Sequence, residues 1–313
     1  MSERVSPGQR LADLGYAAGW RLVRGLPEPL ARAAFRAGAD LATRRGRAGV
    51  AQLRRNYARV VPQAGPGELD ELVRDGVRSY ARYWMETFRL PGMDRHAVFE
   101  RVDETVVGWP LIQAALDRGK GLVVALPHTG NYDVSGIWLA TRAGGFTTVA
   151  ERLRPESLYQ RFLEYRESLG FEILPASGED VGPYRLLMER LRQNRIVCLP
   201  ADRDLSRRGI PVTFFGARTR MPAGPARLAA VTGAQLLIVD NAFTDDGWGL
   251  RFHTPITVHG RDDIAPATQR MADAFAADIA AHPADWHMMQ KLWIEDLSEQ
   301  RQQSLAGEVT EST

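Results

Sequence analysis

His128 and Asp133 place a proton acceptor and a carboxylate within one short segment, Leu126-Pro127-His128-Thr129-Gly130-Asn131-Tyr132-Asp133. A carboxylate that accepts a hydrogen bond from an imidazole fixes its tautomer and raises its basicity, so such a pair can take a proton from a hydroxyl. Residues five apart point away from each other on one helix, whereas a loop between them removes that restriction. The spacing alone is equally compatible with a solvated loop pair.

The elements around this pair favour the catalytic interpretation. Residues 121–126 are an unbroken apolar run with β-branched residues in the middle, which predicts a strand buried on both faces. Pro127 cannot continue a central strand, so a loop should begin there. Asn131 is a suitable cap for a helix over residues 132–142. The predicted loop therefore carries His128 at the carboxyl end of a strand, where open α/β sheets bind their ligands.

Two further charged clusters follow two other predicted strands. Arginines at a strand end can clamp phosphates, and an acidic group there can bind a substrate hydroxyl or assist the histidine. Taken singly, the cluster that follows residues 146–150 is better explained as a solvated charged turn. Three clusters after three strands together predict one catalytic cleft. The candidate residues are Glu151 and Arg152 after residues 146–150, with Arg166 in the next helix, and Asp202, Arg203, Asp204 and Arg208 after residues 195–200.

Apolar strand candidates alternate with helical stretches along most of the chain. This alternation predicts an α/β fold with a mainly parallel central sheet flanked by helices. The predicted strands are residues 121–126, 146–150, 195–200, 235–240 and 249–256. The predicted helices are residues 66–90, 109–117, 132–142, 156–169, 181–193, 222–232 and 265–281.

The two ends of the chain differ from this central region, residues 51–297. Residues 1–50 form a predicted amphipathic helical segment, in which Arg10, Asp13, Arg21 and Arg24 share one narrow arc of a helical wheel. Its wide apolar arc favours contact with a membrane surface, although packing on the protein's own core is the commoner use of such helices. Residues 298–313 are polar and without periodicity, which predicts a disordered tail.

Composition excludes several classes of protein. A net charge of only +2 provides no general attraction to nucleic acid. The single cysteine, Cys198, lies in an apolar run and is expected to be a small core residue. No metal-ligand spacing, nucleophile elbow, phosphate-binding loop or dinucleotide fingerprint occurs, so we expect neither a metal nor a bound cofactor. Without a signal-peptide core or a long apolar stretch, we expect the chain in the cytoplasm or on a membrane surface.

Five short segments of the sequence, taken in their order along the chain, resemble the glycerolipid and lysophospholipid acyltransferases, which carry a His-x4-Asp motif. Within that superfamily the sequence is most similar to the lipid A biosynthesis branch, and there to the actinobacterial phosphatidylinositol mannoside acyltransferases. The likeness extends from the first helix to Trp293. It rests on residues 128–133, on Glu151-Arg152-Leu153-Arg154-Pro155 and Ala201-Asp202-Arg203-Asp204-Leu205, and on residues 212–216 and 221–226.

This resemblance implies transfer of a fatty acyl group, palmitoyl, from acyl-CoA to a mannose hydroxyl of a mannosylated phosphatidylinositol. His128 would be the general base and Asp133 its orienting partner. Asp202 stands where the mannoside branch carries a supporting glutamate, and Asp204 is the alternative for that role. Arg166 and Arg208 would contact the CoA phosphates. The remaining predicted substrate-binding residues are Asn131, Glu151, Arg152, Arg203 and Asp204.

The expected location is the cytoplasmic face of the plasma membrane, with the enzyme bound peripherally. Acyl-CoA is then a co-substrate, and the thioester is activated enough for direct attack without an acyl-enzyme. Three alternatives stay open from the residues: a lipid A-type or other glycolipid acceptor, hydrolysis of acyl-CoA or lipid by water, and non-catalytic lipid binding through the arginine-rich amino-terminal segment.

Overall fold

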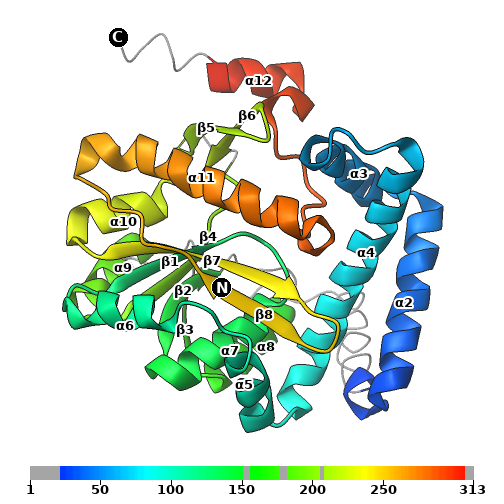
Figure 1. Ribbon diagram of the computed structural model, residues 1–313, viewed down its shortest axis with the longest axis horizontal. Coiled ribbons are helices and arrows are strands. Elements are labelled where there is room, and N and C mark those ends of the chain that lie inside the picture. The colour runs from blue at the N-terminus through cyan, green and yellow to red at the C-terminus, as the bar shows by residue number, and fades with distance from the viewer. Residues whose placement is uncertain (1–21, 151–155, 176–181, 205–207, 307–313) are drawn as a thin grey trace, which may run out of the picture.

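A six-stranded sheet forms the centre of the protein, in the order β3-β2-β4-β1-β7-β8. The computed structural model describes residues 22–150, 156–175, 182–204 and 208–306 (Figure 1). Every pair in the large sheet is parallel except β7 with β8. Its strands are β1 (Leu122–Leu126), β2 (Phe146–Ala150), β3 (Phe171–Pro175), β4 (Ile196–Pro200), β7 (Gln235–Phe243) and β8 (Trp248–Phe252).

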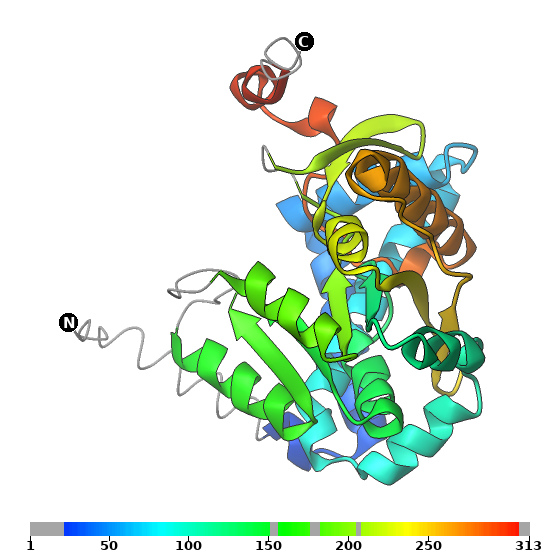
Figure 2. The ribbon, with the colours of Figure 1, turned by 90° about the vertical axis from the view of Figure 1, so that its left-hand side faces the viewer.

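Helices cover both faces of this sheet, which confirms the predicted α/β class. Figures 1 and 2 show α10 and α11 on one side and α7 on the other. The helices over the chain's middle and end are α5 (Arg95–Asp103), α6 (Trp109–Asp117), α7 (Tyr132–Ala143), α8 (Glu156–Ser168), α9 (Pro183–Arg192), α10 (Gly224–Thr232) and α11 (Ile264–Ala281). β1 is buried at every position because helices pack on both of its faces.

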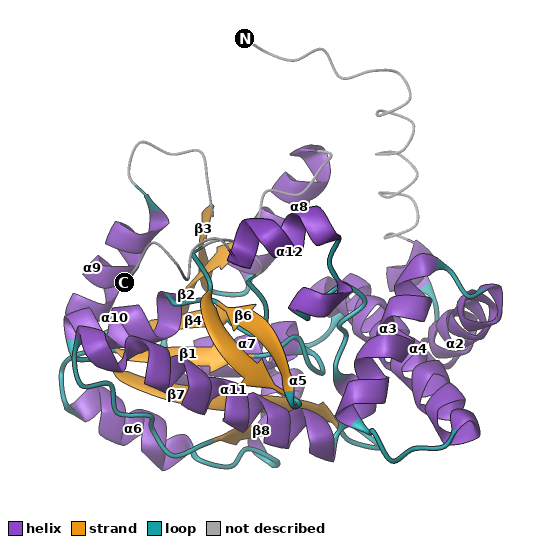
Figure 3. Cartoon of the chain, turned by 90° about the horizontal axis from the view of Figure 1, so that it is seen from above, coloured by secondary structure: helices purple, strands orange, loops and turns teal. Residues whose placement is uncertain are grey.

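Three amino-terminal helices, α2 (Glu28–Arg45), α3 (Ala48–Val60) and α4 (Pro66–Arg89), are grouped at one end of the sheet (Figure 3). The start of α4 is well determined by sequence, because Pro66 occupies its first turn and the Glu68 side chain accepts from the Gly65 amide at 2.8 Å. None of the helices in the described ranges combines the length and apolar composition of a membrane span. Residues 1–21, the first part of the predicted amphipathic segment, lie outside the described residues.

Three strands were not among those predicted. β3 is an edge strand whose Glu172 is paired with Arg190 at 2.6 Å, so its apolar pattern is broken by a charge. β5 (Ile210–Phe214) and β6 (Ala217–Met221) form a separate antiparallel hairpin, joined by Phe215 and Gly216 at positive φ. Phe215 is an unusual residue for such a turn, and this hid the hairpin in the sequence.

The carboxyl-terminal segment also differs from the expectation of disorder after residue 298. Residues 299–306 form the helix α12 (Glu299–Ala306). Leu305 is buried, and its carbonyl accepts a hydrogen bond from Arg220 at 3.2 Å. Gln302 donates to the carbonyl of Leu297 at 2.9 Å. These contacts order a segment that has little apolar periodicity of its own.

Candidate active site

His128 lies on a tight loop between β1 and α7, as the sequence predicts. Pro127 follows the strand, and the Asn131 side chain caps α7 by accepting from the Val134 amide at 3.2 Å. Gly130 has a φ of +54°, and a Cβ on it would lie 2.7 Å from the Asn241 carbonyl oxygen of β7. Glycine is therefore required there for the loop to pack closely on the sheet.

Asp202 is the carboxylate that holds His128. Its Oδ1 lies 2.6 Å from His128 Nδ1, and its Oδ2 accepts from the His128 backbone amide at 3.0 Å. The two residues meet because β4 and β1 are parallel neighbours whose carboxyl ends coincide. An ionised Asp202 places the ring hydrogen on Nδ1 and leaves the basic lone pair on Nε2. The His128 side chain is 43% exposed, so this base can be reached by a substrate.

The Asp202 carboxylate is completely buried but stays ionised. Burial raises the pKa of this carboxyl, whereas the attraction of His128 and the hydrogen bonds from His128 and Trp286 lower it, and the net pKa lies below its ordinary value. Trp286 donates from its indole Nε1 to Oδ2 at 3.1 Å. Trp286 was not a predicted site residue, because it lies 84 positions from Asp202 in a stretch typical of core.

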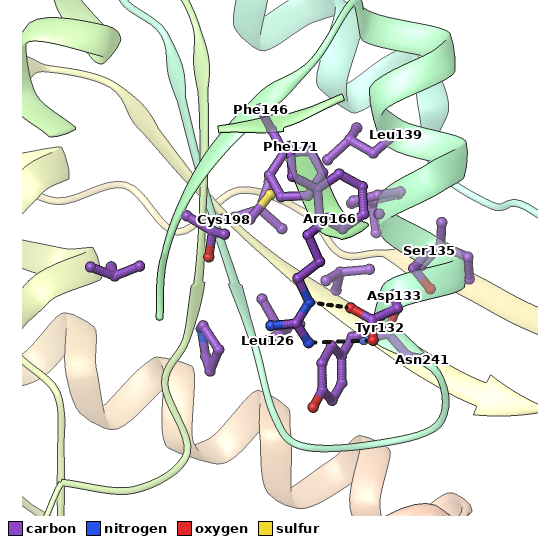
Figure 4. Close-up of a pocket in the computed structure, with 18 residues that line it drawn as sticks. Leu126, Tyr132, Asp133, Ser135, Leu139, Phe146, Arg166, Phe171, Cys198 and Asn241 are labelled. Atoms are coloured by element: carbon purple, nitrogen blue, oxygen red, sulfur yellow. Dashed lines mark hydrogen bonds and ion pairs between the residues drawn. The ribbon is translucent and has the colours of Figure 1, made fainter. Parts of the chain in front are cut away.

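Asp133 has a different partner from the one expected. Its carboxylate is buried and accepts from Arg166 Nε at 2.9 Å and from Arg166 Nη2 at 3.3 Å (Figure 4). Tyr83 also donates to it, at 3.4 Å. Asp133 is the second residue of α7 and binds Arg166, whereas Asp202 binds the histidine. The structure thus corrects the expectation that Asp133 orients His128.

Arg166 is the buried partner of Asp133, and its guanidinium is not exposed as a phosphate ligand would be. Burial lowers the pKa of its guanidinium, but the nearby Asp133 raises it more, so the net pKa is raised and the group stays charged. Asn131 is buried as well, and its amide donates to Glu86 Oε2 of α4 at 2.7 Å. Both residues therefore support the loop from inside, and their contact with a substrate stays a prediction.

The remaining predicted residues either follow the carboxyl end of β4 or lie outside the described residues. The Asp204 backbone amide donates to the Arg220 carbonyl oxygen at 3.0 Å, and the carboxylate bonded to His128 Nδ1 is that of Asp202. Arg203 donates to the Lys291 carbonyl at 3.0 Å. Arg208 is exposed beyond β4. Glu151 and Arg152 lie outside the described residues.

Residues 285–287 clamp the His128 loop from the other side. Trp286 forms an antiparallel bridge with Thr129, and the His287 amide donates to the His128 carbonyl at 2.9 Å. The Gly130 amide donates to the Asp285 carbonyl at 3.0 Å. The loop is thus fixed by main-chain bonds on one side and by Asp202 on the other, which keeps the imidazole in one orientation.

Removal of the indole donor should weaken this arrangement measurably. In Trp286→Phe the buried Asp202 carboxylate keeps its two bonds from His128 and loses the third. Because a hydrogen bond to a charged group contributes about 1.5–3 kcal/mol, we expect the free energy of unfolding to fall by about that amount. Urea denaturation checks this, with Trp109→Phe as the control indole outside the site; equal losses in the two variants would contradict the assigned bond.

His287 should make stability depend on pH. Burial and the nearby His128 lower its pKa to about 3, against an ordinary value of 6.5. Below about pH 6.5 the unfolded chain binds a proton that the native state does not, so stability falls as pH falls. Between about pH 7 and about pH 5 this loss is about 2 kcal/mol. Urea titrations should show a loss smaller by that amount in His287→Gln; parallel pH curves for the two proteins would refute it.

An apolar cavity of about 100 Å³ opens next to this site. Its polar members include Tyr132, Asp133, Arg166 and Asn241, which Figure 4 shows with the apolar wall. The apolar wall includes Leu126, Leu139, Phe146, Phe171 and Cys198. Burial raises the pKa of the Cys198 thiol, so it is a wall residue and not a nucleophile. Among the described residues, no group of three or more histidine, cysteine and acidic side chains could hold a metal ion.

Comparisons with known proteins give matches over nearly the whole chain. The model of the bacterial lipid A biosynthesis acyltransferase family matches residues 4–295. The phosphatidylinositol mannoside acyltransferase of Mycolicibacterium smegmatis is 53% identical over 305 residues, which cover 97% of this chain and 99% of that protein. The protein of the same name from Mycobacterium tuberculosis is 51% identical over 302 residues, covering 96% of this chain and 95% of the relative.

Proposed function

This chain belongs to the bacterial lipid A biosynthesis acyltransferase family, and from that premise we propose that it transfers a long-chain acyl group, palmitoyl, from acyl-CoA to a mannose hydroxyl of a phosphatidylinositol mannoside. The acceptor rests on the names of the two mycobacterial relatives. The single observation that carries the chemistry is the His128–Asp202 contact of 2.6 Å at the edge of an apolar cavity.

The proposed reaction is a direct acyl transfer with His128 as general base. His128 Nε2 takes the proton of the mannose hydroxyl while the hydroxyl oxygen attacks the thioester carbonyl carbon. The carbon–oxygen bond forms, the carbon–sulfur bond breaks, and the CoA thiolate receives the proton. Asp202 stabilises the imidazolium between these two proton transfers, because it is ionised and bound to Nδ1. No cofactor takes part in this scheme.

The apolar cavity is the proposed site for the acyl chain. Its wall consists of side chains from all six strands of the large sheet and from α7 and α8. Tyr132 connects it to the His128 loop, because its ring centroid lies 6.3 Å from that of His128. A chain seated there would present its thioester to the loop and exclude water from it. Exclusion of water favours transfer to a sugar over hydrolysis.

The amino-terminal helices are the proposed membrane contact, at the cytoplasmic face of the plasma membrane. Leu22, Leu30 and Leu41 are exposed by 65%, 59% and 47%, unusual fractions for large apolar side chains. Arg44 and Arg45 end α2 and would face anionic lipid headgroups. Arg203 and Arg208, on the edge that carries Asp202, are the proposed contacts for the CoA phosphates. A peripheral enzyme placed in this way meets its lipid acceptor at the bilayer surface.

The release of CoA with and without acceptor separates this function from its alternatives. We expect palmitoyl-CoA to be consumed only when phosphatidylinositol mannoside is present, and at a much lower rate with a lipid A precursor. Acceptor-independent release of CoA would instead indicate a hydrolase. Vesicle binding without any CoA release would indicate a lipid-binding protein.

A further inference from the structure

The side-chain amide of Asn241, on β7, is buried without a hydrogen-bond partner. The residue is 2% exposed, and neither Nδ2 nor Oδ1 is bonded to any described residue. Nearly all buried side-chain polar atoms in proteins are bonded, and leaving one unbonded costs about 1–3 kcal/mol. A purely structural position in an apolar wall would be filled better by leucine.

Asn241 lies where the proposed reaction takes place. It lines the apolar cavity together with Tyr132, Asp133 and Arg166 (Figure 4). Its own carbonyl oxygen packs against Gly130, in the same loop as His128. Asn241 therefore lines the cavity, and its backbone packs against the loop that carries His128.

Three backbone amides of the loop are already bonded and do not serve as donors to a substrate. The His128 amide donates to Asp202 at 3.0 Å, the Thr129 amide to the Pro127 carbonyl at 2.9 Å, and the Gly130 amide to the Asp285 carbonyl at 3.0 Å. Two nitrogens of Arg166 hold Asp133. The Asn241 amide lines the cavity with its hydrogens unused, so it is available as a donor to the thioester oxygen.

We propose that Nδ2 of Asn241 donates a hydrogen bond to the thioester carbonyl oxygen, an inference that rests on the proposed acyl transfer. As the mannose oxygen bonds to the carbonyl carbon, the carbon–oxygen π electrons move to the carbonyl oxygen, and its negative charge is held by this amide. When the double bond re-forms, the carbon–sulfur bond breaks and the CoA thiolate takes the proton from His128. The donor is fixed in advance by β7, so it needs no reorganisation during the reaction.

The variant Asn241→Leu tests this role, because leucine has a similar size and no donor. We expect kcat for palmitoyl transfer to fall by about 10²–10³, as for loss of one oxyanion donor. The melting temperature should be unchanged or higher, since an unbonded buried amide is removed. Affinity for S-hexadecyl-CoA, a thioether without the carbonyl oxygen, should be unchanged. Asn241→Asp, which lacks the N–H donor, provides a second variant with the same expected loss of kcat.

Thr87→Val is the matched control. Thr87 is also fully buried with an unbonded hydroxyl, but it does not line the cavity, so its replacement should leave kcat unchanged. Wild-type kcat in Asn241→Leu would overturn the inference, as would a lower melting temperature together with weaker S-hexadecyl-CoA binding. If the wild-type protein does not transfer palmitoyl, the proposed function is wrong. If the wild type transfers it and the kcat of Asn241→Leu equals that of the wild type, only the role of Asn241 is wrong.

Discussion

Asp202→Asn is expected to lower kcat for acyl transfer by about 10³–10⁴ while the protein stays folded. The reason lies in how the two carboxylate oxygens are used. Oδ2 accepts from two N–H groups, those of the His128 backbone and the Trp286 indole, so the asparagine carbonyl must take that position. The asparagine NH₂ group then faces His128 Nδ1 and donates to it. The ring hydrogen is forced onto Nε2, which loses its basic lone pair.

Steady-state kinetics with palmitoyl-CoA and phosphatidylinositol mannoside check this prediction. Asp202→Glu is the control, because it keeps two acceptor oxygens and should retain much more activity than the asparagine variant. The circular dichroism spectra of both variants should match that of the wild type. Full activity in a folded Asp202→Asn protein would show that the histidine does not depend on this carboxylate.

Arg166→Met is expected to destabilise the fold by about 3–5 kcal/mol, because it leaves the buried Asp133 carboxylate without its cation. Only 2% of the Asp133 side chain is exposed, so water cannot replace the lost partner. The double variant Arg166→Met/Asp133→Leu removes both charges and should recover most of the loss. Guanidinium denaturation of the wild type, both single variants and the double variant measures the coupling between the two side chains.

The surface pair Arg32–Glu28 provides the comparison for that cycle. Both of its side chains are about half exposed, at 50% and 52%, so its coupling should stay below about 1 kcal/mol. Additive losses in the Arg166/Asp133 cycle would mean that the buried pair does not act as a unit. The role given to Asp133, as the anchor of Arg166 beside the cavity, would then be wrong.

The local parts of the fold could be predicted from the sequence. The apolar run at residues 121–126, Pro127 and the Asn131 cap predict a strand, a loop and a helix start, and the structure has all three. The comparisons also confirm the family resemblance that these blocks suggested. The edge strand β3 was missed because Glu172 interrupts its apolar pattern, and the β5–β6 hairpin because Phe215 occupies a turn position that usually requires glycine or asparagine.

The resemblance gave Asp202 a supporting role, but its direct contact with His128 Nδ1 could not be predicted, because that contact depends on strand order. Proximity in sequence favoured Asp133, five residues away, whereas the sheet places β4 beside β1 and so brings Asp202 to the imidazole. Trp286 reaches the same carboxylate from a segment after α11, which no local pattern connects to the loop. Spacing predicted His128 as the base, and the tertiary structure shows which side chains contact its ring and loop.

Mass spectrometry of the lipid products tests the central claim most directly. Wild-type protein and His128→Ala are each incubated with palmitoyl-CoA and phosphatidylinositol mannoside in vesicles, with His96→Ala as the control for loss of an exposed histidine. The wild type and His96→Ala should both yield the mannolipid heavier by one palmitoyl group, and folded His128→Ala should yield none above background. A folded His128→Ala protein that forms this product at the wild-type rate would contradict the account.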